Sequence, residues 1–232
     1  MSGHLHHGPP AAPVEPGAPP ESAHAPAVSS FRLLATLAIA GAAAGLLVVS
    51  VYRVTLPSIE KYAGQKVEAA VREVLKAPAR WDTLYLVDGA LVTHPPAGVD
   101  GRELARAFVG FNASGDRIGV AVTAQEPGFQ EELLLMVGFD QETGALTGMK
   151  VLDQKETPGL GDKIERDSAF GGQFAGRATP LRGVKTVSDD SPDQVQTITG
   201  ATISSRAVIR IINTAVAKWR PLLAAYRQGG GT

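Results

Sequence analysis

Thr199-Gly200-Ala201-Thr202-Ile203-Ser204-Ser205 introduces the last amphipathic segment of this 232-residue chain. After it, apolar residues recur three and four positions apart, which is the spacing of a helix with one buried face. They are Val208, Ile211, Ile212, Ala215, Trp219 and Leu222. Before it, the polar run from Ser188 to Asp193 indicates a loop. The quoted residues therefore open a helix that we expect to run from about Ala201 to Ala225.

Hydroxyl side chains crowd this helix start, at Thr199, Thr202, Ser204 and Ser205. The first N–H groups of a helix have no partner within it, and the helix dipole adds partial positive charge, so a phosphate group binds well there. Gly200 has no side chain to obstruct a ligand. The alternative is an ordinary helix cap, because Ser and Thr favour that position. The residues alone leave both interpretations open.

Two other features bear on a ligand at this place. Arg206 and Arg210 lie one helical turn apart and would neutralise a phosphate, unless they are solvated surface charges. The loop Glu156-Thr157-Pro158-Gly159-Leu160-Gly161 follows a predicted strand and contains two glycines, which allow the backbone to approach a planar ring closely. An ordinary turn after a strand is the alternative for that loop.

Two motifs resemble those of a known family. Thr199-Gly200-Ala201-Thr202-Ile203-Ser204 resembles the flavinylation motif of membrane-anchored FMN-binding domains. That family includes the G subunit of the Rnf ion-translocating electron-transport complex and the C subunit of the sodium-translocating NADH:quinone reductase. The segment Lys155–Ile164 resembles the loop that lies near the flavin in the Rnf G subunit. The order of anchor, loop and threonine motif also matches, and the resemblance covers roughly Phe31 to Tyr226.

The resemblance implies covalent FMN, esterified through its phosphate to Thr202. The other residues that it implies as flavin contacts are Thr199, Gly200, Ala201, Ser204 and Ser205 in the motif, and Glu156, Thr157, Pro158, Gly159, Leu160 and Gly161 in the loop. One position departs from the family pattern. An acidic residue usually stands six positions before the flavinylated threonine, where this chain has Gln196, and the nearest upstream carboxylate is Asp193.

Composition narrows the chemistry that the chain can perform. It has no cysteine and therefore cannot form a disulfide, an iron–sulfur cluster or a zinc–thiolate site by itself. The net charge of −1 and the lack of a long basic stretch argue against nucleic acid as a partner. No GxSxG, HExxH or phosphate-loop motif occurs, so we expect neither a catalytic residue nor a metal site. His4, His6 and His7 would bind a metal loosely, or they are incidental residues of a tail.

Hydropathy divides the chain into five parts. We expect a disordered Pro/Ala/His-rich tail over 1–30, a transmembrane anchor over 31–53, a connecting amphipathic helix over 54–80, an FMN-binding domain over 81–227 and a flexible end over 228–232. No charged residue occurs from Leu33 to Tyr52, and twenty helical residues span about 30 Å, the thickness of the hydrocarbon layer. The alternative is a cleaved signal peptide, but the apolar run continues well past its Ala38-Ile39-Ala40 site.

Charge and resemblance disagree about orientation. Arg53, Lys61 and Lys66 follow the anchor and only Arg32 precedes it, so the positive-inside rule places the large domain in the cytoplasm. The resemblance implies the reverse arrangement, with the FMN domain on the periplasmic or extracytoplasmic side of the cytoplasmic membrane. We follow the resemblance, because few charges are counted.

Short apolar runs with turn residues between them predict an antiparallel sheet. The runs are 84–92 around Asp88-Gly89, 108–111 and 118–122, 133–139 and 146–151, and a last one at 181–187. Residues 165–176 are expected to form a short helix or loop in which Phe170 and Phe174 pack inward, and 58–77 an amphipathic helix with Ile59, Tyr62 and Val71 on its apolar stripe. With helices at both ends of the sheet, the fold class is α+β.

The resemblance implies one leading hypothesis for function. On this hypothesis the chain would be an electron-carrying subunit of a membrane-bound, ion-translocating oxidoreductase linked to ferredoxin and NAD, and not a complete enzyme alone. Its partners would be other membrane subunits and, for maturation, a flavin transferase. The alternative, which Gln196 favours, is a membrane-tethered regulatory or scaffold module without covalent flavin. The C subunit of a quinone reductase is a third interpretation, which the Gly159-Leu160-Gly161-Asp162 continuation makes less favourable than the Rnf type.

Overall fold

The computed structural model describes residues 29–188 and 191–228. Compactness divides the chain into two units, Met1–Leu56 and Pro57–Thr232. The expected tail with His4, His6 and His7 lies outside the described residues except for its last two positions, and so does nearly all of the expected flexible end.

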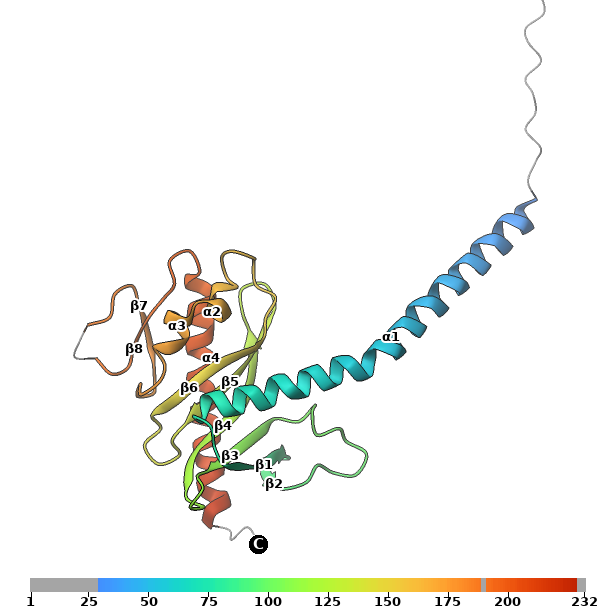
Figure 1. The fold of residues 1–232 in the computed structure, drawn as a ribbon. Helices are drawn as coiled ribbons and strands as arrows, with labels where there is room; N and C mark the ends of the chain where they lie inside the picture. The colour runs from blue at the N-terminus through green and yellow to red at the C-terminus, as the bar shows by residue number, and fades with distance from the viewer. Residues whose placement is uncertain (1–28, 189–190, 229–232) are drawn as a thin grey trace, which may run out of the picture. The chain divides into compact units, whose positions relative to one another are not determined.

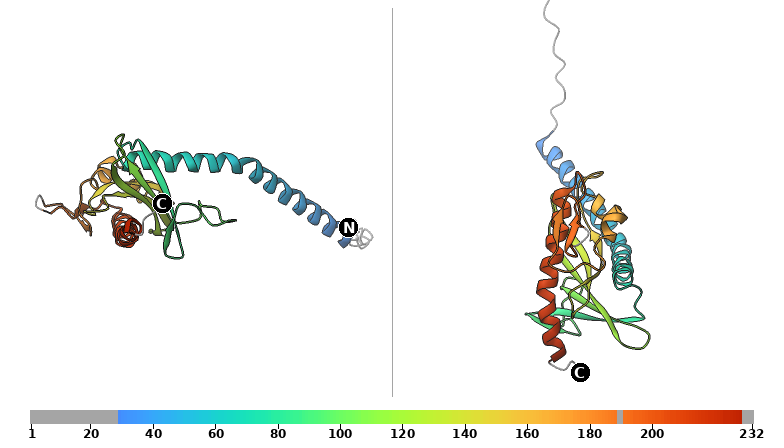
Figure 2. Two further views of the ribbon diagram at one scale, coloured as in Figure 1. Left: turned by 90° about the horizontal axis from the view of Figure 1, so that it is seen from below. Right: turned by 90° about the vertical axis from the view of Figure 1, so that its left-hand side faces the viewer.

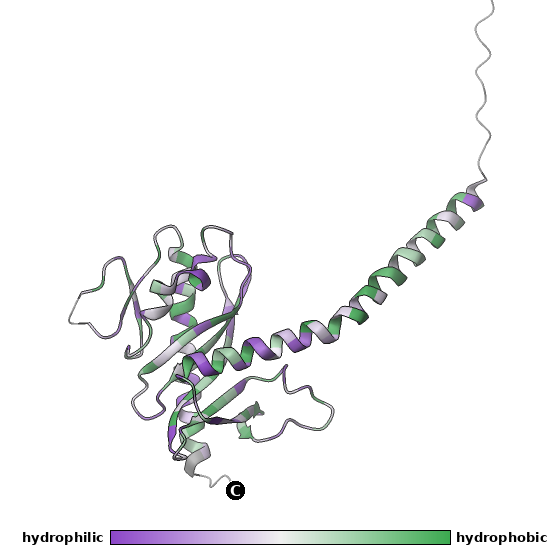
Figure 3. Ribbon diagram, in the orientation of Figure 1, coloured by the Kyte–Doolittle hydropathy of each residue, from purple (hydrophilic) through white to green (hydrophobic). Residues whose placement is uncertain are grey.

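The first helix, α1 (Ser30–Val74), contributes to both units and contains Pro57. Within the first unit its residues are predominantly apolar (Figure 3), and nearly all of them are exposed. An 18-residue window of α1 has a mean hydropathy of 2.3 and no buried residue, so the helix is long and apolar enough to cross a membrane. No break separates the predicted anchor from the predicted connecting helix. In the first half of the predicted apolar stripe of 58–77, Ile59 and Tyr62 are exposed, whereas Val71 in its second half is buried.

The second unit is built on one six-stranded antiparallel sheet (Figure 1). Its spatial order is β2-β1-β3-β4-β5-β6. The strands are β1 (Arg80–Val87), β2 (Ala90–Val92), β3 (Arg106–Phe111), β4 (Arg117–Pro127), β5 (Glu132–Phe139) and β6 (Leu146–Asp153). Asp88 and Gly89 both have positive φ in the turn between β1 and β2, as the predicted Asp-Gly hairpin requires.

Helices cover both faces of this sheet. The last helix, α4 (Thr202–Gln228), runs along one face (Figure 2), and its buried Val208, Ile211 and Trp219 belong to the larger core. On the other face, the last turns of α1 bury Val71 and Val74 in a smaller core. Side chains alternate along each strand, which is why the antiparallel strands can supply both cores. The α+β prediction is confirmed.

A smaller substructure precedes α4. It consists of α2 (Lys163–Arg166), α3 (Ser168–Gly172) and a parallel pair of short strands, β7 (Arg182–Val184) and β8 (Gln194–Gln196). Phe170 and Phe174 are buried, as predicted, and meet edge to face with ring centroids 5.2 Å apart. The strand β8 and its parallel pairing were not predicted, because three residues carry no readable alternation.

Candidate functional site

The N-terminus of α4 is closed by its own residues. Gly200 has φ +84°, a backbone conformation that favours glycine, and it turns the chain into the helix. The backbone carbonyl of Ala201 accepts hydrogen bonds from both the N–H and the Oγ of Ser205, each at 2.9 Å. Ser205 Oγ in turn accepts a 3.1 Å bond from the N–H of Ile198. Ser205 is fully buried and therefore serves the turn itself.

Burial separates the four hydroxyl groups that the sequence brings together. Ser204 is 3% exposed, and its Oγ donates a 2.6 Å hydrogen bond to Glu156 Oε2. Thr199 and Thr202 are exposed. Of these two, only Thr202 lines the cavity at the helix start. Thr202 is consequently the one hydroxyl of the motif that is both accessible and directed to a ligand-sized space.

That cavity has a volume of about 360 Å³. It brings together the helix start, the loop after β6 and the turn between β4 and β5. Its lining residues are Phe129, Glu156, Thr157, Leu160, Gly161, Gly200, Ala201, Thr202, Ile203 and Ser204. The structure therefore unites seven of the predicted contacts with Thr202 and places Thr199, Ser205, Pro158 and Gly159 outside the lining.

Exposed apolar side chains surround Thr202. Phe129 and Ile203 are each 58% exposed and Leu160 is 50% exposed, although all three are large and hydrophobic. Outside α1, the only other large hydrophobic residue of the described chain with comparable exposure is Val99, at 40%. Such a cluster marks a candidate binding surface beside Thr202.

Phe129 and Ile203 were missed by the sequence reasoning. Phe129 lies 73 positions before Thr202 in a turn that the sequence only shows to be a strand connection. Ile203 breaks the apolar periodicity of α4, and that irregularity was the one available signal.

The two arginines on the first turns of α4 have different surroundings. Arg210 Nε lies 3.1 Å from Glu126 Oε2, and its guanidinium also donates to the carbonyl of Pro127. Arg206 is exposed and has no hydrogen bond or ion pair with any residue that the structure describes. Because Arg206 lies four residues after Thr202, on the same helix face, it is the cation available to an anionic group on Thr202.

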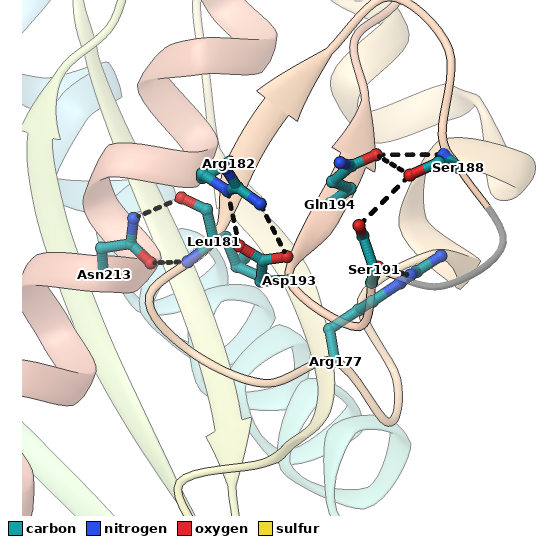
Figure 4. A network of polar contacts seen from close by, with 8 residues as sticks. All are labelled: Arg177, Leu181, Arg182, Ser188, Ser191, Asp193, Gln194 and Asn213. Atoms are coloured by element: carbon teal, nitrogen blue, oxygen red, sulfur yellow. Dashed lines mark hydrogen bonds and ion pairs between the residues drawn. The ribbon is translucent and has the colours of Figure 1, made fainter.

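The segment before the motif is held by polar contacts (Figure 4). Arg182 donates two hydrogen bonds to the Asp193 carboxylate, from Nε to Oδ2 at 2.6 Å and from Nη2 to Oδ1 at 3.3 Å. This guanidinium holds the pKa of the Asp193 carboxyl below its usual range. Gln196, at the position of the family's acidic residue, pairs its backbone N–H with Gln173 Oε1 at 2.8 Å. The nearest upstream carboxylate is therefore already occupied by Arg182.

Similarity to known proteins agrees with this geometry. A model of the FMN-binding domain family matches residues 128–217, which begin at the β4–β5 turn and contain the whole cavity. The chain is 31% identical over 191 residues to the G subunit of an ion-translocating oxidoreductase complex from Aliivibrio fischeri, covering 81% of this chain and 87% of the relative. A protein of the same description from Methanosarcina acetivorans is 27% identical over 185 residues, covering 80% and 92%.

The fold has solved counterparts. A Shewanella oneidensis NqrC structure superposes with a TM-score of 0.55 at 19% identity, covering 66% of this chain and 88% of that one. The C subunit of the Na⁺-translocating NADH-quinone reductase from Parabacteroides distasonis gives a TM-score of 0.55 at 18% identity, covering 72% and 96%. At such identities the likeness shows a shared fold, which confirms the predicted α+β architecture.

Proposed function

The chain belongs to the family of G subunits of ion-translocating oxidoreductase complexes, and from this premise we propose that it carries electrons on an FMN linked covalently to Thr202. The family, the FMN-binding domain and the apolar helix α1 together describe a single-pass, electron-carrying membrane flavoprotein. The flavin, when bound, supplies the redox chemistry that no side chain of this domain can perform.

The observation that best supports the covalent link is the difference in burial and hydrogen bonding among the four hydroxyl side chains of the motif. Ser204 and Ser205 are buried and hydrogen-bonded, and Thr199 lies outside the cavity, so Thr202 alone remains accessible within it. In the attachment step, Thr202 Oγ loses its proton and forms a P–O bond to the flavin phosphate. The phosphoanhydride bond of a flavin adenine dinucleotide donor breaks at the same phosphorus, adenosine monophosphate leaves, and the proton passes to the leaving group or to solvent. A flavin transferase is the partner that this step requires.

The surroundings of Thr202 suit both ends of the cofactor. The helix N-terminus and Arg206 favour the phosphate. Phe129, Leu160 and Ile203 offer apolar contacts to the isoalloxazine ring, and burying them would remove exposed hydrophobic surface from water. The same proposal includes the other flavin contacts predicted in the loop 156–161 and in the motif 199–205. It also includes a transmembrane anchor over 31–53 and an FMN-binding domain over 81–227.

We further propose that other subunits of an ion-translocating complex are its redox partners, with ferredoxin and NAD at the two ends of the chain of electron transfer. The relative in Acetobacterium woodii is described as the G subunit of a Na⁺-translocating ferredoxin:NAD⁺ oxidoreductase complex, at 27% identity over 195 residues. The FMN domain lies on the extracytoplasmic side in this proposal.

A second candidate is a membrane-tethered regulatory or scaffold module without covalent flavin. Gln196 in place of an acidic residue and the occupied Asp193 favour it, because a transferase would meet a neutral side chain there.

Intact mass of the full chain, coexpressed with a flavin transferase, separates the two candidates. The wild type and Thr199→Val should gain the mass of FMN less one water, and Thr202→Val should remain unmodified. Unmodified wild-type protein in the presence of an active transferase would refute the covalent link and support the second candidate.

A further inference from the structure

One buried carboxylate ties together the three segments that line the cavity. Glu156 is only 4% exposed. Its Oε1 accepts hydrogen bonds from the backbone N–H groups of Phe129, at 2.8 Å, and Gln130, at 3.3 Å. Its Oε2 accepts the 2.6 Å bond from Ser204 Oγ. The β4–β5 turn, the loop after β6 and the first turn of α4 thus meet on a single side chain.

All the groups facing this carboxylate are donors. Backbone N–H groups can only donate, and with both oxygens of Glu156 accepting, the ionised carboxylate satisfies every group without a proton of its own. A glutamine amide could accept the two backbone N–H bonds with its oxygen and donate from its NH₂ to Ser204 Oγ, so it would replace only the bond that Ser204 donates. An alanine at position 156 would remove all three hydrogen bonds.

The backbone is shaped to admit this side chain. A Cβ added at Gly161 would lie 2.7 Å from Glu156 Oε2 and 2.9 Å from Ser204 Oγ. A Cβ at Gly128 would collide with Glu156 Oε1 on the other side. The loop glycine that sequence reasoning assigned to a close approach of flavin is thus required first by the Glu156–Ser204 pair.

We propose that Glu156 is a positioning residue, which sets Phe129, Leu160 and Thr202 at fixed places relative to one another so that a flavin on Thr202 is held in one orientation. The proposal rests on the function proposed above. The backbone N–H of Phe129 donates directly to Glu156, and Ser204, which also donates to Glu156, lies two residues after Thr202. Leu160 lies in the same loop as Glu156 and lines the same cavity. In the closed arrangement the three segments meet on Glu156, and in an open arrangement at least one of them has come away. Losing one buried hydrogen bond shifts the equilibrium between the two arrangements roughly tenfold toward the open one.

The test uses the full chain coexpressed with a flavin transferase. The variants are Glu156→Ala, Ser204→Ala and, as a matched control, Glu68→Ala, which alters an exposed glutamate on α1 without an ion pair to any described residue. The readouts are the intact mass, the visible circular dichroism of the bound flavin, and hydrogen exchange at the amides of Phe129 and Gln130.

We expect Glu156→Ala and Ser204→Ala to keep FMN on Thr202 but to lose much of the flavin dichroism, since the ring is no longer fixed. The Phe129 and Gln130 amides should exchange about tenfold faster in Glu156→Ala, and Glu68→Ala should match the wild type. Wild-type dichroism in both site variants and wild-type exchange in Glu156→Ala would overturn the proposal. If Glu156→Ala does not fold, Ser204→Ala decides by the same dichroism.

Failure of the proposed function gives a different result. Wild-type protein without added mass would refute the covalent link, and the exchange rates of Phe129 and Gln130 in the flavin-free protein would still decide whether Glu156 holds the turn.

Discussion

At the scale of single residues, chemistry at this site depends on which polar groups are already satisfied. The sequence presents four hydroxyls and two arginines near one helix start. In the fold, Ser204 is hydrogen-bonded to Glu156, Ser205 to the backbone of the helix turn, and Arg210 is paired with Glu126. Thr202 and Arg206 remain exposed. A side chain whose hydrogen bonds are filled loses them if it reacts, and for that reason the proposal places the flavin on Thr202 and its phosphate near Arg206.

Arg206 is predicted to assist flavin attachment. Arg206→Gln should lower the initial rate of FMN attachment about fivefold, because a cation beside a phosphate at a helix terminus contributes about 1 kcal/mol. The measurement is the fraction modified against time, by intact mass, with purified transferase. Lys218→Gln is the matched control, since Lys218 is exposed on the same helix but sixteen residues from Thr202. Equal rates for the two variants would remove Arg206 from the site.

Sequence reasoning could single out the candidate motif but not the contacts that support it. Thr202 and the loop at 156–161 are predicted from their resemblance to family motifs, because local patterns alone leave an ordinary helix cap and an ordinary turn open. The bond from Ser204 to Glu156 joins positions 48 apart, and that from Phe129 to Glu156 joins positions 27 apart. Such partners are set by the sheet, which places the β4–β5 turn next to the loop after β6, and no local spacing encodes them.

At the scale of elements, α4 is the best predicted part of the chain. Its apolar period matches the observed burial, with Val208, Ile211 and Ile212 fully buried. The parallel pair β7–β8 was not predictable, because its stability comes from side chains elsewhere. Asn213 on α4 holds Leu181 through two hydrogen bonds of 2.7 and 2.9 Å (Figure 4), and Gln173 holds Gln196.

Two isoleucines of α4 give a paired prediction. Ile211→Ala should lower the free energy of unfolding by about 2–5 kcal/mol, because it leaves a cavity in the core. Ile203→Ala should change it by less than about 0.5–1 kcal/mol, because that side chain is exposed. Denaturant titration of flavin-free protein measures both. Comparable losses for the two variants would contradict the assignment of the buried face.

The turn between β5 and β6 gives a pH prediction. Asp140 accepts hydrogen bonds from the backbone and side chain of Thr143, which lower the pKa of its carboxyl. The folded pKa lies below the unfolded value of about 3.9, so this carboxylate stabilises the fold above that pH and the contribution fades as pH falls through the folded pKa.

The stability difference between wild type and Asp140→Asn should therefore be largest near neutral pH and shrink below about pH 3.9. Denaturant unfolding at pH 7 and pH 3 tests this, with Asp88→Asn, at an exposed turn position, as the control for the loss of one carboxylate. A difference for Asp140→Asn that is independent of pH would contradict the prediction.

At the scale of the whole molecule, the chain combines one apolar helix with one cofactor domain. Composition and length suffice to predict the helix, and the antiparallel sheet follows from paired runs and turns. The side of the membrane does not follow from sequence, because few charges flank the anchor and the family resemblance opposes them.

The absence of cysteine makes sidedness measurable. In right-side-out membrane vesicles, Glu103→Cys, at an exposed position of the folded unit, should react with a membrane-impermeant maleimide without lysis. Ser22→Cys, on the other side of the anchor, should react only after permeabilisation. The reverse pattern would place the FMN domain in the cytoplasm, as the positive-inside rule predicts.

The most direct measurement is fragmentation mass spectrometry of the peptide that spans Thr197 to Arg206, taken from full-length chain matured with a flavin transferase. We predict fragments that carry the added flavin phosphate on Thr202 and on no other hydroxyl of the peptide. An unmodified peptide, or a flavin on Thr199, Ser204 or Ser205, would contradict the assignment of Thr202 as the attachment site.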